Sequence, residues 1–298
     1  MDALVVNNIS KSYGSLKALD DVSLKIKKGE MFSLLGPNGS GKTTLISIIS
    51  TLLKADDGCV EIFGEKVAPE NQNTKRVLGV VPQEIVNHGF FSVEEILYFI
   101  SGYYGLYKNK ERVHFLINKL GLEEHRKKLV RQLSGGMKRR LLIAKALVHS
   151  PKILLLDEPT AGVDIELRNS MWEFIKELNR DEEMAILLTT HYLEEAEELC
   201  DQVAIISHGK LLKSGKTKDL IKDLTQRELI ITLSEPAKEV SSQFLTKNSG
   251  TELSFTIPNN MKLGMLLKDL DLDRSLIVDM QIKEGSLEDA FLNVVKEN

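Results

Sequence analysis

The sequence predicts an α/β fold centred on a parallel sheet, with an antiparallel β part and a helical insert, followed by a small α+β domain. Residues 153–156 (Ile-Leu-Leu-Leu) form a continuous apolar run, which is typical of a parallel strand buried on both faces. Up to about residue 217, strand-like segments alternate with segments of helical periodicity, as they do in α/β proteins. The pattern then changes. We therefore expect two domains, residues 1–217 and 218–298, with the helical insert at about 85–150.

Composition excludes several other classes of protein. The 298 residues are 42% hydrophobic and 28% charged, which is ordinary for a globular protein and unlike a disordered or collagen-like chain. No run approaches the roughly 18 apolar residues of a membrane helix, and the N-terminus lacks the layout of a secretory signal. Cys59 and Cys200 stand far apart, so neither a zinc site nor a disulfide framework is expected. We expect a soluble chain in a reducing compartment.

The charge distribution supports the division into two domains. The formal net charge is −4, from 39 basic and 43 acidic residues, so the chain as a whole does not attract nucleic acid or anionic lipid. Residues 225–298 contain 8 basic and 12 acidic residues, which leaves 31 of each sign in residues 1–224. The whole acidic excess therefore belongs to the C-terminal part.

The elements of the first domain follow from apolar periodicity and turn residues. We expect strands at 4–6, 22–26, 31–35, 59–63, 77–81, 153–156 and 185–190. We expect helices at 43–53, within 92–130, and at 134–149, 165–180 and 192–200. Turns are expected at Lys28-Gly29 and at His208-Gly209, and Ser150-Pro151 ends the helix before it. In the second domain we expect strands at 229–233, 253–257 and 276–282 and helices at 261–270 and 286–296.

A glycine-rich segment after the strand at 31–35 predicts a phosphate site. Residues 36–43 match the Walker A pattern G-x-x-x-x-G-K-[ST], with a strand before them and a helix after them. The glycines let main-chain N–H groups point inward at a helix N-terminus, where they bind anions. Lys42 is expected to reach the β- and γ-phosphates, and the Thr43 hydroxyl to bind Mg²⁺. The nucleotide-binding residues of this P-loop are Gly36, Pro37, Asn38, Gly39, Ser40, Gly41, Lys42, Thr43 and Thr44.

Two adjacent acids complete a hydrolytic site. Asp157 ends the apolar strand at 153–156 and is expected to bind the metal, while Glu158 can polarise the attacking water. A strand that simply ends in solvated acids is the alternative. The second acid favours hydrolysis over kinase-type transfer because water is the nucleophile that needs a base.

A second anion-binding surface is predicted at the start of the helix at 134–149. The signature segment, residues 133–137 (Leu-Ser-Gly-Gly-Met), presents a hydroxyl and several N–H groups at a positive helix end. Ser134 as an ordinary N-cap, with glycines as a flexible start, is the structural alternative.

In residues 1 to about 217 the sequence resembles the ATP-binding cassette (ABC) ATPases. The family's motifs occur in order: the P-loop, Gln83 after Val-Val-Pro, Leu-Ser-Gly-Gly, Asp157-Glu158, residues 161–164 (Ala-Gly-Val-Asp) and His191. The resemblance implies a P-loop NTPase fold with an antiparallel β subdomain and a helical subdomain, and it implies ATP and Mg²⁺ as cofactors.

The resemblance also implies a partner and further site residues. Two copies would pair head to tail around ATP, so that Ser134, Gly135 and Gly136 act in trans, and Asp164 would contact the opposite cassette. The remaining roles are carried over by position. Tyr13 would stack on adenine, unless it is an ordinary turn tyrosine. Gln83 would touch the metal or the water, and His191 would hydrogen-bond the γ-phosphate and orient Glu158; a histidine at a strand end is otherwise usually structural.

The sequence departs from the family pattern at two positions. Met137 stands where Gln is usual, and Met cannot close a capping box, so we expect a less firmly capped helix. Residues 161–164 replace the commoner Ser-Ala-Leu-Asp, but Asp164 is retained.

The main functional hypothesis is the energising subunit of a transporter. Seven of the 17 aromatic residues lie between positions 90 and 107, and exposed aromatics are typical of partner-binding surfaces, although some must pack inside the insert. These are Phe90, Phe91, Tyr98, Phe99, Tyr103, Tyr104 and Tyr107. Residues 162–168, Met171-Trp172 and residues 285–291 resemble the ATPase subunits of bacterial ABC-2-type exporters. The resemblance implies a separate transmembrane permease and a place on the cytoplasmic face of the inner membrane.

The alternative is a soluble cassette ATPase for nucleic-acid, ribosome or iron–sulfur assembly work. Only one cassette is present, no sustained heptads follow the P-loop, and no basic stripe suggests nucleic-acid contact. We therefore favour the exporter and expect no nucleic-acid partner.

Overall fold

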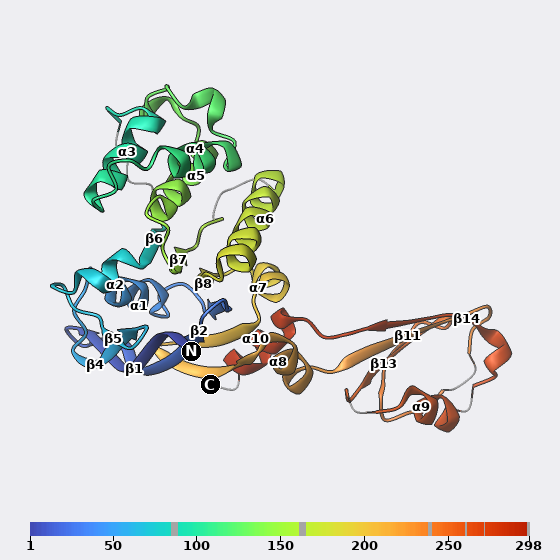
Figure 1. Cartoon of the computed structure of the whole chain (residues 1–298). Helices are drawn as coiled ribbons and strands as arrows, with labels where there is room; N and C mark the ends of the chain where they lie inside the picture. Colours follow the sequence, from blue (N-terminus) through green and yellow to red (C-terminus); the bar gives the residue numbers. More distant parts are fainter. Residues whose placement is uncertain (85–88, 161–164, 238–239, 260, 271, 297–298) are drawn as a thin grey trace. The chain divides into compact units, whose positions relative to one another are not determined.

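The computed structural model describes residues 1–298 except 85–88, 161–164, 238–239, 260, 271 and 297–298. The chain divides into two compact units, Met1–Ser214 and Gly215–Asn298 (Figure 1). The predicted contact of Asp164 with the opposite cassette falls in residues 161–164, which lie outside the described residues. No helix among the described segments has both the length and the apolar character needed to cross a membrane.

The first unit is built on a six-stranded sheet in the order β10-β9-β3-β8-β7-β6. Neighbouring strands from β9 to β6 run parallel. The bounds are β3 Met31–Leu35, β6 Leu78–Val81, β7 Ile153–Asp157, β8 Ala185–Thr190, β9 Gln202–Ser207 and β10 Lys210–Lys216. The predicted turn between β9 and β10 is present, and both of its residues, His208 and Gly209, have positive φ.

The central strands are buried on both faces, which explains their unbroken apolar sequence. Leu154 and Leu156 of β7 point into one hydrophobic core, whereas Ile153 and Leu155 point into another. The first core contains the helical insert, and the second contains helix α1 and a four-stranded sheet. This alternation is the two-residue period of a strand.

The four-stranded sheet has the order β2-β1-β4-β5 and is antiparallel. Its strands are β1 Asp2–Tyr13, β2 Leu16–Lys27, β4 Asp57–Ile62 and β5 Glu65–Lys66. β1 and β2 are each twelve residues long, so the predicted strands at 4–6 and 22–26 were too short. The polar residues that interrupt the apolar pattern face solvent on the open side of this hairpin, where a strand needs no apolar side chain.

The helices of the first unit connect these strands. They are α1 Lys42–Ile49, α2 Gln72–Arg76, α3 Val93–Tyr103, α4 Lys110–Lys119, α5 Gly135–Leu147, α6 Ile165–Glu182 and α7 Leu193–Leu199. Two 3₁₀ turns, Glu123–His125 and Val130–Gln132, lie between α4 and α5. In Figure 1 the helical insert, drawn in green, lies on the opposite side of the central strands from the blue antiparallel sheet.

The second unit is an antiparallel sheet in the order β12-β13-β11-β14 with helices α8, α9 and α10. Its elements are α8 Thr217–Leu224, β11 Arg227–Leu233, β12 Leu245–Asn248, β13 Glu252–Ile257, α9 Leu263–Asp269, a 3₁₀ turn Arg274–Leu276, β14 Ile277–Lys283 and α10 Leu287–Lys296. The sequence did not reveal α8 or β12. β12 has a polar sequence and an exposed surface, so it lacks the alternation that marks a strand.

Candidate functional site

The P-loop joins β3 to α1 and is shaped by its glycines. Gly41 has φ +108°, and a Cβ atom there would overlap the Ala18 carbonyl oxygen. A Cβ atom at Gly36 would overlap the Ile206 carbonyl oxygen. Both positions therefore require glycine, for conformation at Gly41 and for close packing at Gly36. The result is a tight turn whose following main-chain N–H groups open toward the start of α1.

Lys42 is buried inside this loop. Its Nζ donates to the carbonyl oxygens of Gly36, at 2.8 Å, and Pro37, at 3.1 Å, and lies 3.8 Å from Glu158 Oε1. Burial lowers the pKa of Lys42, although the nearby carboxylates of Glu158 and Asp157 oppose this effect. The ammonium group thus sits between the loop and the acid that follows β7.

A cavity of about 500 Å³ opens above the P-loop. Three kinds of residues line it: the P-loop, the end of the β1–β2 hairpin, and residues after the central strands. The lining includes Tyr13, Leu16, Ala18, Asn38, Gly39, Ser40, Gly41, Lys42, Thr43, Thr44, Gln83 and Glu158. The structure therefore brings Tyr13, which is 51% exposed, together with the predicted loop residues around one concave site.

Asp157, the last residue of β7, and Glu158, which follows it, are both buried and both hydrogen-bonded to Thr189 of β8. Thr189 Oγ1 donates to Asp157 Oδ1 at 2.6 Å, and the Glu158 N–H donates to the Thr189 hydroxyl oxygen at 3.1 Å and to its carbonyl oxygen at 3.0 Å. Glu158 has φ +46°, a left-handed conformation that non-glycine residues rarely adopt. Thr189 thus hydrogen-bonds both the side chain of Asp157 and the main chain of Glu158.

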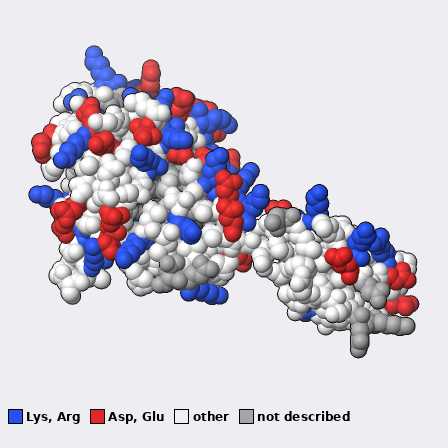
Figure 2. Space-filling view, turned by 90° about the horizontal axis from the view of Figure 1, so that it is seen from below, with Lys and Arg blue, Asp and Glu red and all other residues white. Residues whose placement is uncertain are grey.

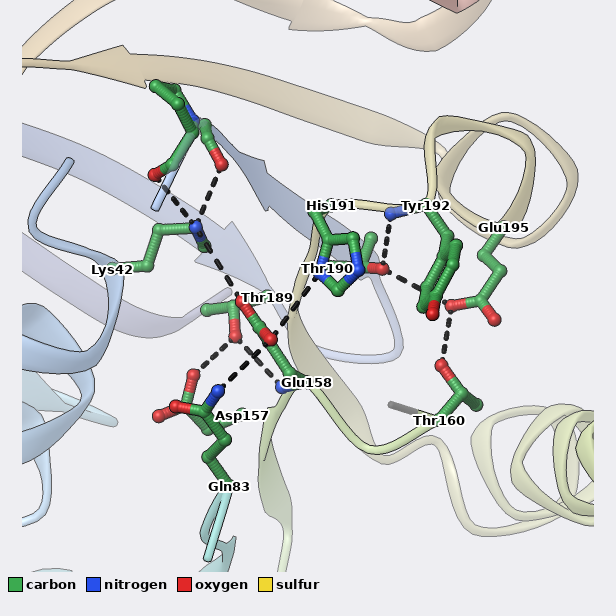
Figure 3. A network of polar contacts seen from close by, with 12 residues as sticks. Lys42, Gln83, Asp157, Glu158, Thr160, Thr189, Thr190, His191, Tyr192 and Glu195 are labelled. Carbon is green, nitrogen blue, oxygen red and sulfur yellow. Dashed lines mark hydrogen bonds and ion pairs between the residues drawn. The ribbon is translucent and has the colours of Figure 1, made fainter. Parts of the chain in front are cut away.

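The Glu158 carboxylate is the centre of a polar network (Figure 3). Gln83 Nε2 donates to Glu158 Oε2 at 3.2 Å, and His191 Nδ1 lies 3.4 Å from the same oxygen. Together with Lys42 on the other oxygen, these residues come from four separate segments of the chain. The predicted catalytic residues Lys42, Gln83, Glu158 and His191 therefore meet at one carboxylate.

Two residues that the sequence did not single out position this network. Thr189 is the first. Arg139, in the second turn of α5 and two residues after the signature segment, is the second: it is 4% exposed, and its guanidinium donates to main-chain carbonyl oxygens. The acceptors are Pro82 and Gln83, at 2.9 Å each, Pro159 at 2.5 Å, Asp157 at 3.2 Å, and Glu158. The sequence pattern of a helix does not reveal such a residue, because its hydrogen-bond partners are distant in the sequence.

A second buried polar cluster lies behind His191. Glu195 of α7 accepts hydrogen bonds from the Thr160 hydroxyl at 3.0 Å and the Thr190 hydroxyl at 3.3 Å. Burial raises the pKa of Glu195. The Thr190 hydroxyl also accepts from the Tyr192 N–H at 2.9 Å. This cluster fixes the turn that carries His191, as Figure 3 shows.

The signature segment does not contribute to this cavity. None of its residues lines the cavity, and Ser134 and Gly135 are exposed. Ser134 caps α5 by accepting the Met137 N–H at 3.3 Å, but a reciprocal bond from residue 137 is absent from this described helix start. Met137 instead packs against the hydrophobic core of the insert. The helix is thus capped from one side only, as its sequence predicted.

The residues of the cavity fit a magnesium-bound nucleoside triphosphate. Ser40 lines the cavity, and its Oγ atom is buried with no hydrogen-bond partner among the described residues. The described residues contain no cluster of three or more His, Cys, Asp or Glu side chains that could hold a metal. A cation at this site would therefore depend on the Thr43 hydroxyl, the Gln83 amide oxygen, Asp157 and phosphate oxygens.

The fold and this site define a P-loop nucleoside triphosphate hydrolase. Comparison with known proteins narrows the class. Residues 19–161 match the family model described as ABC transporter. A linearmycin resistance ATP-binding protein of Bacillus subtilis is 36% identical over 98% of this chain and 97% of its own length. The Nod factor export ATP-binding protein I of Sinorhizobium fredii is 37% identical over 80% of this chain and 70% of its own.

Solved structures agree with this assignment. A dimeric ATP-binding cassette in a post-hydrolysis state, bound to ADP and phosphate, superposes with a TM-score of 0.65 at 27% identity, over 72% of this chain and 98% of that one. The chain belongs to the ABC transporter family. It is an ABC-type ATPase, and its fold is the one predicted from the sequence.

Proposed function

We propose that this chain hydrolyses Mg²⁺-bound ATP between two copies of itself and that the cycle drives export through a separate membrane permease. The observation that carries the proposal is the division of the predicted site: the cavity contains P-loop residues and Glu158, while the signature segment, with Ser134 and Gly135 exposed, lies outside it. One copy therefore holds half of the groups that should surround the phosphates.

Within one copy, each residue has a role that follows from its position. Lys42 and the P-loop N–H groups bind the phosphates, and Tyr13 stacks on the base at the rim of the cavity. Thr43, Asp157 and Gln83 hold Mg²⁺, which neutralises charge on the phosphate oxygens when it is bound. These are the residues predicted for nucleotide and metal.

Glu158 acts as the general base for the attacking water. Gln83 and His191 both contact its Oε2 atom, so the carboxylate is held in one orientation. His191 also reaches toward the position of the γ-phosphate from the end of β8.

The second copy supplies Ser134, Gly135 and Gly136 to the phosphates, and Asp164 to the contact between cassettes. A hydroxyl and free N–H groups at the start of α5 form an anion-binding surface that one chain does not direct at its own P-loop. The dimeric form of the similar cassette supports pairing of this kind.

Mixing two inactive variants tests the trans arrangement. Lys42→Ala removes the P-loop cation, and Ser134→Ala removes the signature hydroxyl, so each homodimer is inactive at both sites. A mixed dimer regains one intact site, and ATPase activity should return to at most about a quarter of the wild-type rate, because half of the random dimers are mixed and each has one intact site of two. A mixture as inactive as its components would contradict the proposal.

Export is proposed from the relatives and from an exposed surface. One relative is named for Nod factor export and another for linearmycin resistance. On the insert, four of the seven clustered aromatics are well exposed: Phe90 (90%), Tyr107 (85%), Tyr103 (84%) and Phe99 (57%). Such a density of exposed aromatics favours a docking surface for a protein partner.

Co-purification from membranes tests the permease. The chain should be recovered with a multi-span membrane protein, and the double change Tyr103→Ser with Tyr107→Ser should abolish recovery while leaving ATP binding intact. An exposed tyrosine outside this cluster, Tyr13, is unsuitable as a control because it lines the cavity; Phe115, on α4 and 39% exposed, is the matched control. Equal loss of recovery with Phe115→Ser would remove the aromatic cluster from the proposal.

A further inference from the structure

Strand β14 of the second unit leaves an apolar surface open. It is an edge strand of the described sheet β12-β13-β11-β14, and it pairs on one side with β11. Met280 and Ile282 lie opposite Ile231 and Leu229, which are fully buried, yet Met280 and Ile282 are 47% and 45% exposed. Because opposite residues in a sheet share a face, the core face continues across β14 without cover.

The strand has only some of the devices that protect sheet edges. Natural edges are blunted by proline, bulges, charges or very short strands. β14 has a register shift near Val278 and a lysine, Lys283, at its other end. Between them, residues 279–283 have no proline and run in regular register with β11. This segment can accept another strand.

The sequence of the segment is complementary to itself. Residues 279–283 read Asp-Met-Gln-Ile-Lys, an acid and a base separated by two apolar residues around a central glutamine. Antiparallel pairing with an identical strand about a two-fold axis at Gln281 places Asp279 opposite Lys283 of the second copy, and Met280 opposite Ile282. Each of these favourable pairs occurs twice because of the symmetry.

The hydrogen bonds of the free strand agree with this register. The Met280 N–H donates to its neighbour Asp279 Oδ1 at 2.8 Å, so it does not point at β11. In the two-fold register this N–H would bond the Ile282 carbonyl of the second copy. The Asp279 carboxylate would then be released toward Lys283, whose contact with Glu228 in its own chain is a long 3.9 Å.

We propose that the second units of two copies pair through β14, joining two four-stranded sheets into one continuous sheet. This interface is separate from the nucleotide-dependent pairing of the first units. It places Met280 of each copy beside Ile282 of the other, and it gives the acidic C-terminal part a role in holding the copies together.

Cysteine cross-linking of the full-length chain without nucleotide tests the register. If Met280 and Ile282 form hydrogen-bonded pairs, the two Gln281 residues form the adjacent non-hydrogen-bonded pair, with Cα atoms about 4.5 Å apart. A disulfide bridges Cα atoms about 4.4–6.8 Å apart, so Gln281→Cys should convert the chain to a covalent dimer on mild oxidation. Asp279→Cys is the matched control: its two copies lie four residues out of register, about 13 Å apart, and should not cross-link.

The wild-type chain controls for Cys59 and Cys200, the natural cysteines. Majority cross-linking of Gln281→Cys with background levels for Asp279→Cys supports the proposal. Equal cross-linking of the two variants, or none, overturns it.

Exchanging the charges of Asp279 and Lys283 tests the same pairing without covalent cross-linking. Asp279→Lys alone and Lys283→Asp alone place like charges opposite each other twice, and each should weaken the nucleotide-free dimer about tenfold in sedimentation equilibrium. The double variant restores both pairs and should restore the dissociation constant. A monomeric wild-type chain, or a double variant as weak as the singles, would contradict the inference. Lys42→Ala should leave this nucleotide-free dimer unchanged. Failure of the β14 pairing can therefore be distinguished from failure of the ATP-dependent pairing.

Discussion

Arg139 donates to the main-chain carbonyl oxygen of Gln83 at 2.9 Å, and the side chain of the same glutamine donates to Glu158, the proposed general base. The same guanidinium donates to the carbonyl oxygens of Asp157, at the end of β7, and of Pro159. Helix α5 therefore has two roles. Its start presents the signature segment, and Arg139 in its second turn fixes the main chain of Gln83 relative to that of Asp157 and Glu158. The hydrogen bonds of Arg139 thus connect helix α5 to the main chain of Gln83 and of Glu158, the proposed general base.

Replacing Arg139 with Gln should lower the ATPase rate more than nucleotide affinity. Several buried carbonyl oxygens would lose their donors, at a cost of about 1–3 kcal/mol in the free energy of unfolding. Since none of them belongs to the P-loop, ATP binding should persist while turnover falls by about tenfold or more. Steady-state kinetics with nucleotide-binding titrations measure the two effects. Arg131→Gln, a change at an exposed arginine nearby, should alter neither.

Thr189→Val should impair the site although Thr189 contacts neither nucleotide nor metal in the proposed arrangement. The substitution keeps the shape of the side chain but removes the donor to Asp157 and the acceptor for the Glu158 N–H. We expect a loss of about 1–3 kcal/mol in unfolding free energy and a reduced turnover rate. Thr189→Ser retains the hydroxyl and should restore most of both. If Val and Ser variants behave alike in denaturation and turnover, the hydroxyl has no such role.

Replacing Gly36 and Gly135 with alanine, one at a time, should separate an effect on folding stability from an effect on ATPase activity. Gly36→Ala forces a Cβ atom into the Ile206 carbonyl oxygen, so we expect a destabilisation of about 1–3 kcal/mol together with loss of ATP binding. Gly135→Ala meets no heavy atom within 4 Å and lies in the first turn of α5. Its melting temperature should be unchanged or slightly raised, while ATPase activity falls, because in the proposed dimer the added methyl group would face the partner's phosphates. Unaltered activity of Gly135→Ala would argue against that contact.

His149 should make stability depend on pH. Its ring stacks on Tyr104 with centroids 3.8 Å apart, and its Nε2 bonds the Leu78 carbonyl oxygen at 3.0 Å. Burial lowers the pKa of His149 from 6.5 to about 4. The unfolded chain therefore binds the proton first as the pH falls.

The stability that depends on neutral His149 is fully present above pH 6.5 and is lost as the pH falls from 6.5 toward 4, by about 3 kcal/mol in total. Urea denaturation at pH 7.5 and pH 5 measures this difference. His149→Phe keeps a ring against Tyr104 but cannot titrate, so its unfolding free energy should change less between the two pH values. An equal slope for both proteins would assign the pH dependence to other groups.

The surface charge of the protein agrees with the composition. Figure 2 shows Lys and Arg side chains mixed with Asp and Glu over the face in view, without a basic stripe of the kind that nucleic-acid binding proteins present.

The chemistry of this protein could be inferred from the sequence because its main elements are local. The P-loop, the Asp157-Glu158 pair after an apolar strand and the capped start of α5 are each encoded in consecutive residues. β8 was predicted with its observed bounds, Ala185–Thr190, for the same reason: buried parallel strands are continuous apolar runs. The exposure of the aromatic cluster was only half predictable, because Tyr104 packs on His149 whereas Tyr103 faces solvent.

The remaining features depend on contacts between residues far apart in the chain. Arg139 and Thr189 look ordinary in a helix and a strand, and only their hydrogen bonds to segments 18 to 57 residues away reveal that they position the acids. Likewise, Met280 and Ile282 have the spacing of core residues, and only the three-dimensional sheet shows that β14 is its edge. Periodicity records which face of an element is apolar, whereas the tertiary structure decides what covers that face.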